Sequence, residues 1–80
     1  MDVETTRDVL RAAFRSSSEL HGLLPTLKQR CAPDEYKVYA RRIAAAIDAI
    51  GAALINNALI EHPELKSEVE DRIAKEGRYS

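Results

Sequence analysis

The sequence contains little cysteine, glycine or aromatic residue. It has one cysteine, three glycines and no tryptophan in 80 residues. A single cysteine excludes an intrachain disulfide framework and a cysteine-rich zinc module. Because the unpaired thiol of Cys31 is most stable in a reducing compartment, we expect a cytoplasmic protein. The first residues are acidic and polar, unlike a secretory signal or a mitochondrial presequence.

The chain also lacks a surplus of charge of either sign. Twelve Lys and Arg oppose thirteen Asp and Glu, which gives a net charge of −1. Strong nucleic-acid binders usually carry a basic surplus that neutralises phosphates, so nucleic-acid binding stays open only through a local basic surface. With 45% hydrophobic residues, the chain is nevertheless too apolar to be disordered. A single core is marginal at this length.

The apolar residues repeat with helical periodicity, and alternation at period two is absent, which predicts an all-α fold. Pro33 and Pro63 divide the chain, because proline fits the first turn of a helix and disrupts its interior. The sequence therefore predicts one domain over residues 1–80, with helices at about 3–31, 33–62 and 63–76.

The first of these helices contains Gly22 and Pro25, which disturb it near residues 22–25. Two outcomes are open: a kinked continuous helix, which we favour, or a break followed by a short helix. The short connection before Pro33 makes the two long helices antiparallel neighbours. The expected core unit is a long helical hairpin with a short C-terminal helix.

The second helix is apolar on two faces. Between Ile43 and Ile60, fourteen of eighteen residues are apolar, which is more than one neighbouring helix can cover. On a helical wheel one face is bulky and consists of Tyr36, Tyr39, Ile43, Ile47, Ile50 and Leu54. The other, here called the small-residue face, consists of Val38, Ala45, Ala49 and Ala52, with Ile55 and Leu59 at its flank.

A second copy of the chain is the simplest cover for the small-residue face. We therefore predict a homodimer in which two hairpins form a four-helix bundle, with a tetramer also possible. Two other covers are open: a membrane, which the charge of Asp48 opposes, and the C-terminal helix folding back. The predicted dimer interface consists of Val38, Ala45, Asp48, Ala49, Ala52, Ile55 and Leu59.

Asp48 borders the small-residue face and has no basic residue one turn away on its helix. A buried, unpaired carboxylate is costly. One hypothesis pairs Asp48 with Arg41 or Arg42 of a second chain whose helix runs in the opposite direction. The alternative is that Asp48 points to water.

Arg7, Arg11 and Arg15 are spaced by four residues and form a basic stripe on the first helix. The stripe could bind a phosphate or an acidic partner. The favoured alternative is a solvated face in which these arginines pair with nearby carboxylates.

His21 is a candidate phosphoacceptor. A histidine followed by a proline on a long helix resembles the phosphoacceptor segments of sensor kinases and phosphotransfer proteins. Gly22 and the spacing from His21 to Pro25 depart from that pattern. The resemblance implies a histidine phosphotransfer module as one alternative function, and the other reading is a surface histidine near a kink.

The sequence contains no phosphate-binding glycine loop, no H-E-x-x-H motif and no cluster of catalytic residue types. We therefore expect no catalytic residues, metal or cofactor. The function favoured by the sequence is that of a non-enzymatic, homo-oligomeric helical protein that acts through protein–protein interaction, as an adaptor, inhibitor or regulator. Its protein partner is not identified by the sequence, and a nucleic-acid-binding regulator using the arginine stripe is an alternative.

Overall fold

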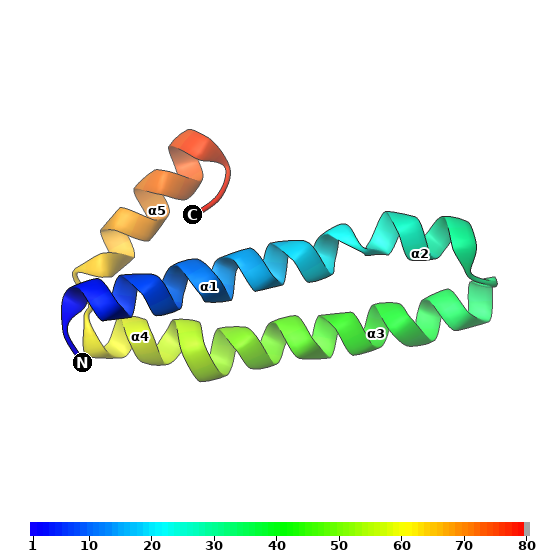
Figure 1. The fold of residues 1–80 in the computed structure, drawn as a ribbon, viewed down its shortest axis with the longest axis horizontal. Helices are drawn as coiled ribbons and strands as arrows, with labels where there is room; N and C mark the ends of the chain where they lie inside the picture. The colour runs from blue at the N-terminus through cyan, green and yellow to red at the C-terminus, as the bar shows by residue number, and fades with distance from the viewer. Residues whose placement is uncertain (80) are drawn as a thin grey trace.

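The computed structural model of the protein describes residues 1–79, and this part of the chain is helical and contains no strand (Figure 1). The all-α prediction is therefore confirmed. The elements are α1 (Val3–Gly22), α2 (Leu24–Arg30), α3 (Pro33–Ile50), the π-helical segment η1 (Gly51–Ile55), α4 (Asn56–Glu61) and α5 (Leu65–Glu76). The segments α3, η1 and α4 follow one another without a loop and form one helix, here called the long helix, of 29 residues.

Side chains and prolines fix the helix starts. The Asp2 carboxylate accepts a hydrogen bond from the Thr5 amide at 2.7 Å and caps α1. Pro33 is the first residue of α3, and the Glu35 carboxylate accepts a hydrogen bond from the Ala32 amide at 3.2 Å. At the other end of the chain, Gly77 ends α5 with a φ of 78°, a conformation that glycine adopts without steric cost.

Leu23 separates α1 from α2. Its backbone stays right-handed helical, with φ −74° and ψ −22°, and its amide donates to the Leu20 carbonyl at 3.2 Å. Pro25 has no amide hydrogen to continue the ladder to His21. The interruption is thus confined to one residue, and α2 continues along the line of α1 (Figure 1).

The C-terminal helix begins two residues later than the sequence suggests, at Leu65 rather than Pro63. His62 precedes a proline and has non-helical angles, φ −129° and ψ 77°. The Leu65 amide then donates to the His62 carbonyl at 3.0 Å, which closes a turn around the proline. This turn allows α5 to leave the direction of the long helix.

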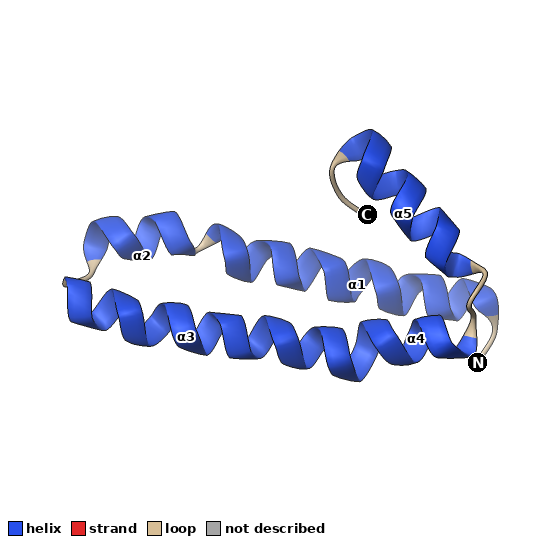
Figure 2. Ribbon diagram, turned by 180° about the vertical axis from the view of Figure 1, so that it is seen from behind, coloured by secondary structure: helices blue, strands red, loops and turns tan. Residues whose placement is uncertain are grey.

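The hairpin is a single layer of helices. The long helix runs antiparallel to α1 and α2, and the chain measures 45 × 25 × 15 Å along its principal axes (Figures 1 and 2). We call the end at the Cys31–Ala32 connection the closed end, and the end with Met1 and the α4–α5 connection the open end. From the open end, α5 turns back along the α1 side of the hairpin (Figure 2). The opposite side of the long helix is not covered by α5.

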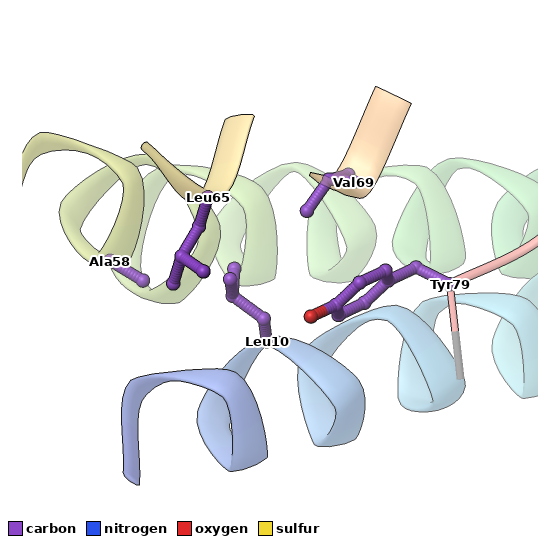
Figure 3. Close-up of a cluster of buried hydrophobic side chains, with 5 residues drawn as sticks. All are labelled: Leu10, Ala58, Leu65, Val69 and Tyr79. Atoms are coloured by element: carbon purple, nitrogen blue, oxygen red, sulfur yellow. The ribbon is translucent and has the colours of Figure 1, made fainter. Parts of the chain in front are cut away.

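A small core joins α5 to the hairpin at the open end (Figure 3). Tyr79, two residues past Gly77, folds back against α1, and its ring meets the Phe14 ring edge to face at 5.6 Å between centroids. Because the two partners lie on segments far apart in the sequence, the cluster fixes the position of α5. Its buried members are Leu10, Ala58, Leu65, Val69 and Tyr79.

Polar contacts add to this attachment. The Arg7 Nε donates to both carboxylate oxygens of Glu68, at 3.1 and 3.2 Å, and the Tyr79 hydroxyl donates to Glu68 Oε2 at 2.9 Å. Burial tends to raise the pKa of Glu68, but these hydrogen bonds and the arginine charge outweigh it and lower the pKa. Burial also raises the pKa of Tyr79. Glu68 is therefore the charged group through which α5 is held to α1.

We expect Tyr79→Ala to detach α5 from the hairpin. Loss of the buried ring should lower the free energy of unfolding by about 3 kcal/mol, within the range for large-to-small core substitutions. Hydrogen exchange should then become fast throughout α5 while α1 and α3 stay protected. Tyr79→Phe keeps the ring and removes only the hydrogen bond to Glu68, so its loss should be smaller. Unchanged protection of α5 in Tyr79→Ala contradicts this role.

Ser17 provides a second test of packing. Its hydroxyl oxygen is buried and has no hydrogen-bond partner among residues 1–79. Ser17→Ala removes that unpaired group and improves helix propensity, so we expect a gain in unfolding free energy of roughly 1–2 kcal/mol. The exposed neighbour Ser18 is the control: Ser18→Ala should gain only the propensity, about 0.5 kcal/mol. Chemical denaturation of both variants measures the two gains in unfolding free energy. Equal gains would contradict a destabilising role for the unpaired Ser17 hydroxyl.

Candidate interaction surface

The long helix is apolar and mostly uncovered. Its most apolar 18-residue window has a mean hydropathy of 1.8, yet only 11% of that window is buried in the protein. By length and composition this is a helix that could cross a membrane. On its bulky face Ile43 is buried against the hairpin partner, whereas Tyr39 and Leu54 are 46% and 45% exposed, so α1 and α2 cover that face only in part.

The small-residue face lies open. Val38 is 45% exposed, and Ala45, Ala49 and Ala52 are exposed as well. The C-terminal helix does not fold back over them, because α5 packs against Leu10 and the other core residues on the α1 side. Of the three covers considered from the sequence, the intrachain one is therefore excluded.

A π-helical turn changes which residues belong to this face. The Asn56 amide donates to the Gly51 carbonyl, five residues back rather than four. One extra residue in a turn rotates everything after it by about 100° relative to a regular helix. The extra rotation builds up across Gly51–Ile55, so the helical wheel drawn from the sequence, which assumed a constant period, fails for Ile55 and the residues after it.

Two expected interface residues are displaced by this rotation. Ile55 and Leu59 are partly buried against the core cluster rather than on the small-residue face. Ile60, which was assigned to neither face from the sequence, is 74% exposed, the most exposed large hydrophobic residue of the chain's described part. The apolar surface considered for association consists of Val38, Ala45, Ala49, Ala52 and Ile60, and the long helix also exposes Tyr39, Ala44, Ala46, Ala53 and Leu54.

Charged residues border this surface. Asp48, Arg41 and Arg42 are exposed, and the Arg42 guanidinium lies 5.3 Å from the centre of the Tyr39 ring. Asp48 thus points to solvent in the single chain. Its helical neighbours one turn away are alanine and glycine, so no basic residue of its own helix lies one turn from it.

His21 and Asp48 line one shallow hollow of about 200 Å³ between the end of α1 and α3. The floor of the hollow is apolar and includes Leu24, Ile43 and Ile47. His21 is exposed, which agrees with its being a surface histidine and does not distinguish that role from a phosphoacceptor. The structure brings together two polar residues that the sequence analysis treated separately, without a hydrogen bond between them.

The arginine stripe is engaged within the chain. Arg7 pairs with Glu4 on its own helix and with Glu68 on α5. Arg11 pairs with Asp8 at 3.2 Å. Arg15 is exposed and lines a hollow beside Tyr79. Two of the three guanidinium groups are therefore already bound to carboxylates.

A polar cluster at the open end was not predicted from the sequence. His62 Nε2 lies 2.9 Å from the Met1 carbonyl oxygen, and His62 Nδ1 lies 3.1 Å from Glu64 Oε1. Since both neighbours are acceptors, both ring nitrogens must donate, which favours the imidazolium form. The Met1 carbonyl first, and Glu64 second, raise the pKa of His62. These contacts join the start of α1 to the turn before α5. In the sequence, the proline after His62 was the one signal that the backbone turns at this position.

Stability should therefore depend on pH through His62. A group whose pKa is raised by folding stabilises fully below its unfolded value, about 6.5, and that stabilisation is lost as the pH rises through the folded value. We expect the free energy of unfolding to fall over that interval. The fall should be reduced in His62→Gln and retained in His21→Gln, as measured by denaturation at a series of pH values. An identical pH profile for all three proteins contradicts the assignment.

Among the described residues, no group of three or more histidine, cysteine or acidic side chains could hold a metal ion. The sequence matches no family model, and comparisons with curated proteins and with solved structures gave no match. The exposed surface of the long helix is the feature of the described chain that bears on function.

Proposed function

We propose that this chain is a non-enzymatic protein that associates with itself through the long helix and acts through protein–protein interaction, as an adaptor, inhibitor or regulator in the cytoplasm. The observation that carries the proposal is the uncovered apolar surface Val38, Ala45, Ala49, Ala52 and Ile60. Small side chains allow two helix axes to approach closely. In such a dimer the two long helices form the central pair of a four-helix assembly, because α1 lies on their far sides.

The size of the accessible surface supports the dimer. A folded monomer of this mass exposes about 4,800 Å² on the general scaling with molecular mass, whereas this chain exposes 5,671 Å². The excess, about 850 Å², is close to the area that each partner buries in a standard protein–protein interface. The radius of gyration, 14.7 Å, likewise exceeds the value of about 11.6 Å typical of a compact domain of this length.

The exposed residues of α1 and of the long helix differ in polarity, and the difference supports association through the long helix. Exposed residues of α1 include Asp8, Arg15, Ser16 and Glu19, which suit contact with water. The exposed residues of the long helix after Arg42 are mostly alanine with larger apolar residues. Because the long helix packs along the charged α1, a bilayer around it would also have to accept that helix. These features favour a second copy over a membrane.

Light scattering after gel filtration tests the proposal. We expect the wild-type protein to have the mass of two chains. Ala49→Glu places a charge on the small-residue face, and we expect at least a tenfold loss of affinity, because a buried charge without a partner is strongly unfavourable.

Ala12→Glu is the matched control, since Ala12 is exposed on α1 and the substitution is chemically identical. It should remain dimeric. A wild-type protein that is monomeric in buffer contradicts the proposal. Co-flotation of such a monomer with phosphatidylglycerol vesicles identifies a membrane as the cover instead.

A further inference from the structure

In the proposed dimer the two long helices can run parallel or antiparallel. The distribution of charge along the protein favours one of these two orientations. Residues 21–42, which make up the closed end, contain five basic and two acidic side chains. Residues 1–12 and 56–79, at the open end, contain six basic and nine acidic side chains. The near-neutral chain therefore has about three positive charges at one end of a 45 Å axis and three negative charges at the other.

Building on the proposed dimer, we infer that the two long helices pair antiparallel, so that each closed end lies beside the open end of the partner. Packed helices lie 8–10 Å apart, which is about one Debye length at 0.1 M salt. The charges that lie this close to the partner are those of the long helix itself, where residues 33–42 contain three basic and two acidic side chains and residues 56–61 contain one acidic side chain. Antiparallel pairing places opposite net charges together at both ends, whereas parallel pairing places like charges together.

The flank of the small-residue face gives independent support. Arg41 and Asp48 are seven residues apart, which is two helical turns, so both lie on the same flank of the long helix. A two-fold axis that reverses the helix direction brings equal flanks of the two helices together. Arg41 of each chain then faces the Asp48 carboxylate of the other chain, which has no basic residue one turn away on its own helix.

This pairing also defines a register. The two Arg41–Asp48 contacts lie symmetrically about a crossing point next to Ala45, where the small side chain allows close approach. Relative to that point, the two copies of Cys31 lie at opposite ends of the assembly. At 1.5 Å per residue along the helix, they are separated by roughly 40 Å. In a parallel dimer they lie side by side.

The single cysteine makes the orientation measurable in the natural sequence. Cys31 is partly exposed at the closed end, where a nitroxide spin label can be attached. Pulsed electron paramagnetic resonance on the labelled dimer should give a distance of roughly 40 Å between the two labels. A distance below about half that value identifies a parallel dimer and overturns the inference, while the proposed dimer itself stands. A monomeric mass in the same sample overturns the proposed function as well.

A charge exchange tests the contact between the chains. We expect Arg41→Glu to weaken the dimer at least tenfold, and the double variant Arg41→Glu with Asp48→Arg to restore the affinity to within about threefold. Arg15→Glu makes the same charge change on the exposed side of α1 and should leave the affinity unchanged. A double variant as weak as Arg41→Glu contradicts the pairing. Loss of the dimer in Arg15→Glu also contradicts the Arg41–Asp48 pairing, because a change of net charge alone would then weaken the dimer.

Discussion

The long helix is apolar on two faces, and the hairpin supplies only one helix to pack against it. α1 and α2 cover the side that includes Ile43, while the opposite side, with Ala45 and Ala49 at its centre, faces solvent in the single chain. An 80-residue chain gains little stability from a single layer of helices, because each helix in such a layer buries only part of its surface. The elongated shape, the excess accessible area and the exposed alanines are consequences of this one constraint, and the proposed association of two chains would relieve it.

The attachment of α5 shows how the chain stabilises its other side. Tyr79 places a buried ring against α1, and Glu68 accepts hydrogen bonds from both Tyr79 and Arg7. Together with the contacts of His62 at the open end, these interactions occupy α5 on the α1 side of the hairpin. The small-residue face is consequently left free, which is the geometry that self-association through the long helix needs.

Local signals made most of the fold predictable. The period of the apolar residues, with Pro33 and Pro63, predicted the helices, and the short connection before Pro33 predicted their antiparallel hairpin. The π-helical turn at Gly51–Ile55 was not predicted in this way, because the helical wheel assumes one constant period along the whole helix. It moved Ile55 and Leu59 to the core and Ile60 to the surface. The pairing of Arg7 with Glu68 joins residues 61 positions apart, and such contacts leave no periodic trace in a sequence. The position of Tyr79 was missed for the same reason.

The central claim is that the stable unit consists of two chains, and the dependence of thermal unfolding on concentration tests it most directly. When folding is coupled to association, the midpoint of unfolding rises with protein concentration by mass action. Helical circular dichroism should therefore show a midpoint that increases steadily over about three decades of protein concentration. A midpoint that stays constant over that range, in a sample whose mass is that of one chain, would contradict the account.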